Sequence, residues 1–156
     1  MVCEIQGNPN GADQRFAVVV SRFNEPVTQA LQVGAVEELT RHGVDPENIL
    51  VAHVPGAFEI PVATQTLART GRYAGIICLG ALIRGETPHF DYLSSAVAHS
   101  LERISVEIGI PVGFGVLTTE TGQQALDRCG GSKGNKGAEA AHTVLEMVDL
   151  ISRINS

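Results

Sequence analysis

The feature that most constrains this chain is a regular alternation between short apolar runs and longer stretches with helical periodicity. The short runs are rich in Val and Ile, which is typical of strands buried on both faces of a parallel sheet. They are Phe16 to Val20, Ile49 to Val54, Ile76 to Leu79 and Val112 to Leu117. This alternation predicts an α/β fold, a right-handed, doubly wound, flavodoxin-like three-layer α/β/α sandwich around a four-stranded parallel sheet.

Helical patterns fill the stretches between these runs. Pro26 opens a pattern that ends near Gly43, where glycine is a common helix stop, and a shorter pattern runs from Ile60 to Leu67. A longer stripe runs from Leu93 to Ile108. The last two predicted helices are Gln123 to Arg128 and Ala138 to Ile154, and the glycine-rich segment 130–137 between them is interpreted as a loop.

Length and charge narrow the class of protein further. A chain of 156 residues suits a single domain, 1–156, with a polar N-terminal arm over 1–15. The net charge of -6 argues against a nucleic-acid surface, which needs clustered cations. No apolar run approaches the roughly 20 residues of a membrane span, and the first residues lack a signal-peptide pattern. We therefore expect a cytoplasmic protein with no membrane association.

The spacing of the cysteines does not predict a metal site, and none is expected. The three cysteines are far apart and lack C-x-x-C pairing, so we interpret them as reduced thiols. Four of the five histidines are interpreted as structural: His42, His53, His99 and His142.

Most of the unusual residues follow the predicted strands. In open parallel sheets ligands bind beyond the carboxyl ends of the strands, which directs attention to the segments 21–24, 55–59, 80–89 and 118–121. Gly85, Glu86 and Thr87 lie between a strand and a helix, where free amides and the helix dipole attract an anion. An ordinary glycine turn is the alternative, because the spacing matches no nucleotide-binding motif.

Several other residues have both a chemical and a structural interpretation. His89 is placed to exchange protons near neutral pH or is an exposed loop histidine. Glu59 is either a hydroxyl-binding carboxylate or a favourable charge at a helix start. Phe23 and Phe114 each either stack on a flat ligand or have no ligand role, and core packing is the default interpretation for Phe114 because it lies within a strand.

A basic segment stands out in this acidic chain. Arg128, Lys133 and Lys136 lie among glycines, and such side chains hold phosphate as a bidentate fork or as mobile point charges. A solvated basic loop is the alternative.

Taken together, five motifs closely resemble the lumazine synthase family, 6,7-dimethyl-8-ribityllumazine synthases. They occur in that family's order over nearly the whole chain, from Phe16 to Ile154. The motifs are Arg22-Phe23-Asn24, Val54 to Pro61, Gly80 to Tyr92, Phe114 to Thr119 and Gly134-Asn135-Lys136-Gly137.

The resemblance implies a transferase of riboflavin biosynthesis that needs no cofactor or metal. It would condense 5-amino-6-(D-ribitylamino)uracil with 3,4-dihydroxy-2-butanone 4-phosphate and release phosphate. The family's substrate-binding positions correspond here to Phe23, Ala57, Phe58, Glu59, Ala81, Leu82, Ile83, Phe114 and Lys136. The phosphate would lie on Gly85, Glu86, Thr87 and Arg128, and His89 would move protons.

The resemblance also implies a homo-oligomer whose active sites lie between subunits. In the family the counterparts of Phe114, Arg128 and Lys136 come from a neighbouring subunit, so the minimal unit is a pentamer. Some members form larger assemblies, decamers or icosahedral 60-mers. An association of this chain with riboflavin synthase is a further expectation that the resemblance raises. Here Lys133 directly precedes Gly134, whereas shell-forming members usually place their lysine one residue earlier. The sequence therefore does not decide whether this chain forms an icosahedral shell.

Two other classes remain open on the sequence alone. A non-catalytic, flavodoxin-like module that binds a phosphometabolite or a flavin would keep the anion site but would not need His89. A structural shell protein would keep the pentamer without turnover, although the intact set of site residues argues against lost catalysis.

Overall fold

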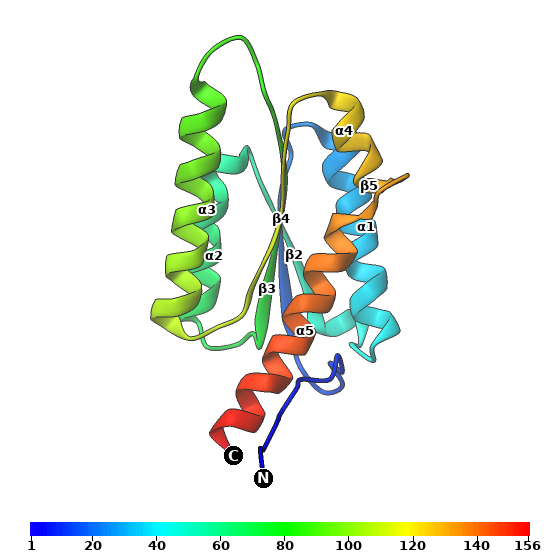
Figure 1. The fold of residues 1–156 in the computed structure, drawn as a ribbon, viewed down its shortest axis with the longest axis vertical. Coiled ribbons are helices and arrows are strands. Elements are labelled where there is room, and N and C mark those ends of the chain that lie inside the picture. Colours follow the sequence, from blue (N-terminus) through cyan, green and yellow to red (C-terminus); the bar gives the residue numbers. More distant parts are fainter.

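The chain folds around one parallel sheet with helices on both faces, as expected for this α/β class. The structure is a computed structural model that describes residues 1–156. The four long strands are all parallel, in the order β2-β1-β3-β4. Figure 1 views this sheet edge-on, with α2 and α3 on one face and α1, α4 and α5 on the other. The predicted three-layer sandwich with a four-stranded parallel sheet is confirmed.

The elements alternate along the chain as the sequence predicts. The sheet strands are β1 (Phe16–Ser21), β2 (Ile49–Val54), β3 (Gly75–Ile83) and β4 (Val112–Thr119). The α-helices are α1 (Glu25–Arg41), α2 (Ile60–Arg69), α3 (His89–Ile108), α4 (Gly122–Asp127) and α5 (Lys136–Asn155). Two short 3-10 helices, η1 (Pro46–Asn48) and η2 (Ala57–Glu59), flank β2.

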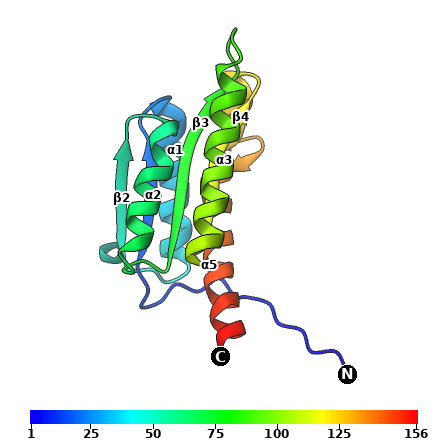
Figure 2. The ribbon, with the colours of Figure 1, turned by 90° about the vertical axis from the view of Figure 1, so that its left-hand side faces the viewer.

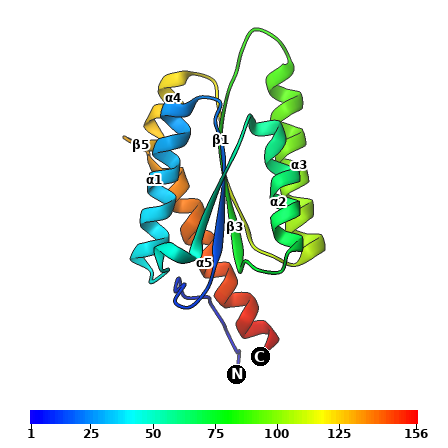
Figure 3. The same ribbon diagram turned by 180° about the vertical axis from the view of Figure 1, so that it is seen from behind.

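Two apolar cores, one on each face of the sheet, hold the layers together. Phe16, Leu31 and Leu145 join β1 to α1 and α5 on one face, and all three are fully buried. On the other face Ile60 and Leu101 pack from α2 and α3. Burying a side chain of this size stabilises a fold by about 1.5 to 3 kcal/mol, so the two cores hold the helices against the sheet. Figure 3 shows the same two helical layers from behind.

Two predictions about irregular segments need correction. Strand β3 continues through Gly80 to Ile83, which the sequence analysis assigned to a loop, because β4 pairs with it as far as Ile83 and Thr119. The segment 130–137 is not a plain loop: Cys129–Gly131 (β5) and Gly134–Asn135 (β6) form a small antiparallel hairpin. Because β3 extends to Ile83, the loop that follows this strand begins at Arg84.

The N-terminal arm runs along the base of the molecule and then away from it (Figure 2). Three hydrogen bonds attach it: Gly11 donates its amide to the carbonyl of His42 at 2.9 Å, Asn8 donates to Asp149 Oδ2 at 2.7 Å, and the carbonyl of Arg15 accepts from the amide of Ala74 at 2.8 Å. The first residues beyond these attachments are exposed. No helix of the structure combines the length and the apolar character that a membrane span requires.

Candidate functional site

A cavity of about 450 Å³ lies at the carboxyl ends of β1, β2 and β3, and we call it the strand-end cavity. Its walls come from the segments that follow these three strands and from the start of α3. The lining residues are Phe23, Pro55, Gly56, Ala57, Phe58, Glu59, Leu82, Ile83, Gly85, Thr87, His89, Phe90 and Leu93. A second hollow, about 560 Å³, is a groove between α2 and α3 and shares only Phe58 and Glu59 with the first. The strand-end cavity is the one at the position where parallel sheets bind ligands.

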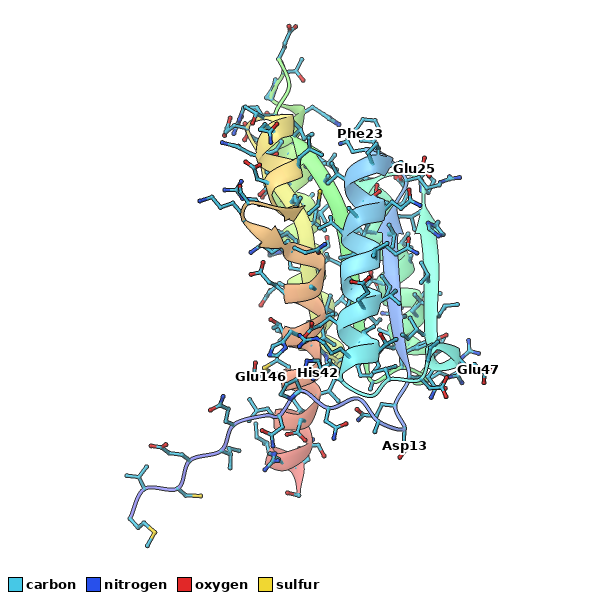
Figure 4. The ribbon with its side chains drawn as sticks, turned by 90° about the vertical axis from the view of Figure 1, so that its right-hand side faces the viewer. Asp13, Phe23, Glu25, His42, Glu47 and Glu146 are labelled. Carbon is cyan, nitrogen blue, oxygen red and sulfur yellow. The ribbon has the colours of Figure 1, made fainter.

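Phe23 is held at the mouth of the cavity by the turn after β1. Asn24 adopts a left-handed conformation, with φ of 62°, and its amide Nδ2 donates to the carbonyl of Ala81 at 3.0 Å. The Phe23 amide is near Ser21 Oγ, at 3.3 Å. With 66% of its surface exposed, the Phe23 ring offers a flat apolar face that no core contact uses. Figure 4 shows it at the upper end of the sheet.

Glu59 contributes the only carboxylate in the cavity lining. It ends the short helix η2 and precedes α2, where a negative charge is favoured. Gly56 leaves room for it, since a Cβ at this glycine would lie 3.2 Å from Glu59 Oε1. Glu59 forms no ion pair within the chain, so its oxygens are free to accept hydrogen bonds from a ligand's hydroxyl groups.

The loop between β3 and α3 presents donors to the same cavity. The amides of Gly85 and Glu86 donate no hydrogen bond to the rest of the backbone, and no side chain caps the start of α3. A helix of this length carries a partial positive charge at its N-terminus, so these amides suit an anion. Thr87 and His89 line the cavity beside them, and the His89 amide is 3.4 Å from Thr87 Oγ1.

Arg84 braces this loop, a role that the sequence analysis missed. Its guanidinium forms a fork with Asp91, at 3.1 and 3.2 Å, and its Nε lies 2.8 Å from Glu120 Oε2. The guanidinium also lies over the ring of Phe90, at 4.6 Å from the centroid. These contacts tie the loop to both α3 and the end of β4. No local sequence signal identifies them, because the partners meet only in the folded chain.

Three predicted site residues lie away from the cavity: one on β4, one just after α4 and one at the start of α5. Phe114 is 43% exposed on β4, an edge strand, and faces a separate shallow hollow beside α3. Arg128 follows α4 and donates to the carbonyl of Gln124, and Lys136 opens α5 with its ammonium group 3.7 Å from Glu139. The strand-end cavity therefore has no Lys or Arg in its lining.

Ala81 and Glu86 are also absent from the lining. The side chain of Ala81 is buried in the core between the sheet and α1, so only its carbonyl, which accepts from Asn24, contributes to the region. Glu86 is exposed, and its contribution to the loop is its backbone amide.

Asn135 organises the basic segment and was also missed as a functional residue. Its Oδ1 accepts from the amides of Gly137 and Ala138 at 2.9 and 3.1 Å, which caps α5, while Nδ2 donates to the carbonyl of Ala30 at 3.0 Å. Gly34 makes this approach possible, since a Cβ there would lie 2.4 Å from the Asn135 side chain. The signal was available, because asparagine before a helical run is a preferred N-cap.

Comparison with known proteins agrees with this arrangement. The family model described as 6,7-dimethyl-8-ribityllumazine synthase matches residues 13–152. A curated 6,7-dimethyl-8-ribityllumazine synthase from Protochlamydia amoebophila (strain UWE25) is 48% identical over 152 residues, which cover 97% of this chain and 88% of that protein. The chain therefore belongs to the 6,7-dimethyl-8-ribityllumazine synthase family.

Proposed function

We propose that this protein condenses 5-amino-6-(D-ribitylamino)uracil with 3,4-dihydroxy-2-butanone 4-phosphate to give 6,7-dimethyl-8-ribityllumazine, with release of phosphate. Family membership over nearly the whole chain supports this reaction. The observation that carries it is the strand-end cavity, which combines an exposed aromatic ring, a free carboxylate, a histidine and unpaired amides at a helix start.

In this proposal the pyrimidine substrate occupies the part of the cavity next to Phe23. Its flat ring stacks on Phe23, with Leu82 and Ile83 along its edge. The ribityl chain extends towards Ala57 and Phe58, where Glu59 accepts hydrogen bonds from its hydroxyl groups. Ala81 supports this end of the cavity through its backbone, by holding Asn24.

The phosphorylated substrate binds at the start of α3. The amides of Gly85, Glu86 and Thr87 receive the phosphate, where the helix dipole favours a negative charge. His89 lies next to this point and moves protons as phosphate leaves and the second ring closes. Most of the acceleration comes from holding two reactive molecules in register, because orientation alone contributes several kcal/mol.

A second copy of the chain completes the site with the missing cation. A phosphate ester needs a positive partner, yet the cavity lining within one chain has none. Arg128, Lys136 and Phe114 all lie towards the β4 side of the chain, outside its own cavity, where they can reach a neighbour's site. We propose that this arrangement repeats around a homopentamer that works in the cytoplasm.

The test of the reaction follows both products together. Purified protein is mixed with the two substrates, and lumazine fluorescence and phosphate release are recorded against an uncatalysed control. We expect both signals to accelerate in equal molar amounts. Substrate binding without acceleration of either product would refute the proposal and favour a non-catalytic binding module.

A further inference from the structure

A polar cluster at the far end of α1 has no part in the proposed reaction. Glu38 and His42 lie one turn apart on and just after α1, and His142 reaches them from α5. Phe23 and Glu25 mark the opposite end of α1, and the rise of the helix from Glu25 to Glu38 separates the cluster from that end by about 20 Å (Figure 4).

Both imidazoles lie within hydrogen-bond distance of one oxygen atom of the Glu38 carboxylate. Glu38 Oε1 lies 2.8 Å from His42 Nε2 and 3.0 Å from His142 Nδ1, and the three ligand atoms are all within 4.8 Å of one another. The imidazole planes cross at 71° with centroids 5.4 Å apart, so the two rings approach from different directions. Three atoms that can ligate a metal ion therefore lie close together, on side chains from two helices.

The surroundings fix the carboxylate and leave the imidazoles accessible. The Glu38 side chain is 8% exposed, and Arg41 donates to its second oxygen, Oε2, which leaves Oε1 directed at the imidazoles. Carboxylates that bind metals are commonly oriented by such a partner. His42 and His142 are 20% and 43% exposed, so an ion can reach the centre from solvent. The Arg41 charge opposes a cation, although this side chain is 68% exposed and the surrounding water weakens the repulsion.

From this geometry we propose that Glu38, His42 and His142 bind one divalent transition-metal ion of the Zn²⁺ type. Two imidazoles and one carboxylate are a donor set that such ions prefer, whereas Mg²⁺ and Ca²⁺ take oxygen ligands. Ligands at about 2.0 Å in a tetrahedral site lie roughly 3.3 Å apart. The two oxygen–nitrogen spacings, 2.8 and 3.0 Å, would therefore open by a few tenths of an ångström, and the spacing between the two nitrogens, which is within 4.8 Å, would adjust to the same value. Water would occupy the fourth position, and the ion would join α1 to α5.

This inference revises the sequence interpretation of His42 and His142 as purely structural. Metal-binding motifs are recognised by short spacings, and His142 lies 104 residues from Glu38 in the chain. The proposed metal site is independent of the proposed reaction, since the ion would lie far from both substrates.

The test uses full-length protein without a histidine tag, freed of metal by a chelator and then titrated with Co²⁺, with Zn²⁺ as competitor. We expect about one Co²⁺ per chain, visible absorption bands of a low-symmetry site, and displacement by Zn²⁺. His142→Gln keeps a hydrogen-bond donor for Glu38 but removes the imidazole, and should weaken binding at least tenfold. The matched control is His99→Gln, an exposed histidine on α3, which should bind as the unmodified protein does.

His42→Gln provides a second, independent variant in case His142→Gln does not fold. Loss of Co²⁺ in either folded variant, with retention in His99→Gln, supports the site. No binding by the unmodified protein, or equal binding by both cluster variants, would overturn the proposal and leave the three side chains as a hydrogen-bonded network only.

Discussion

Replacing Asn135 tests how the basic segment is fixed to the rest of the fold. Asn135→Ala removes two interactions at once: the Oδ1 cap on the amides of Gly137 and Ala138, and the Nδ2 bond to the carbonyl of Ala30. Loss of an asparagine N-cap costs about 1 kcal/mol, and loss of a hydrogen bond to a backbone carbonyl about 1 kcal/mol more. We therefore expect the free energy of unfolding to fall by about 2 kcal/mol.

For a chain of this length that loss lowers Tm by roughly 4 to 8 °C, which calorimetry can measure. Asn135→Ser is the matched control, because the serine hydroxyl still accepts from the first amides of α5 and only the bond to Ala30 is lost. It should cost about half as much. Hydrogen exchange at Gly137 and Ala138 should accelerate in Asn135→Ala and stay slow in Asn135→Ser. A Tm change below about 2 °C for Asn135→Ala, or equal effects of the two substitutions, would refute this reasoning.

Three further predictions concern the site and the core. Arg84→Met keeps packing against Phe90 but removes both ion pairs, so the loop between β3 and α3 should lose its position. We expect kcat/KM for lumazine formation to fall about 10- to 100-fold, and unchanged kinetics would show that the brace is dispensable. Arg128→Ala should reduce turnover more than His89→Ala, which slows the reaction without abolishing it, and steady-state kinetics showing the reverse order would contradict the phosphate assignment. Burial raises the pKa of the Cys78 thiol to about 12, although the Thr64 hydroxyl at 3.2 Å opposes this shift, so the reactive thiolate is absent at pH 8. Iodoacetamide should therefore modify exposed Cys3 but leave Cys78 intact in the folded protein, as peptide mass spectrometry can establish.

The sequence predicted the sheet and most helices because their signals are local. The run from Ile49 to Val54 coincides with β2, and Gly43, the glycine expected to end α1, has a positive φ of 94°. Strand β3 was predicted too short, because Gly80 was assigned to the loop that follows it. In the structure this glycine instead allows close packing, since a Cβ would lie 3.2 Å from Ile60 Cδ1.

The candidate site was predictable in part for a similar reason. Phe23, Glu59 and His89 follow consecutive strands, and the sheet brings such segments to one edge. The brace at Arg84 and the cluster around Glu38 could not be predicted, because each joins side chains from separate elements. The hairpin at Cys129 was also missed, since its pairing with Asn135 depends on the cap and on contact with α1 rather than on strand-forming residues.

The most direct test of the account is complementation between two inactive variants. Phe23→Ala/His89→Ala damages the strand-end cavity, and Arg128→Ala removes the cation that a neighbour is proposed to supply. Each variant should show little activity alone. When the two variants are co-assembled in equal amounts, a site is intact only where an undamaged cavity meets an undamaged Arg128 from its neighbour. Random mixing produces this combination in about one quarter of the sites, so about one quarter of the lumazine formation of the unmodified protein should return.

Recovery near that level would show that each active site is built from two chains. Activity that stays at the average of the two separate variants, in particles shown by mass spectrometry to contain both, would contradict the shared site and with it the account of how phosphate is held.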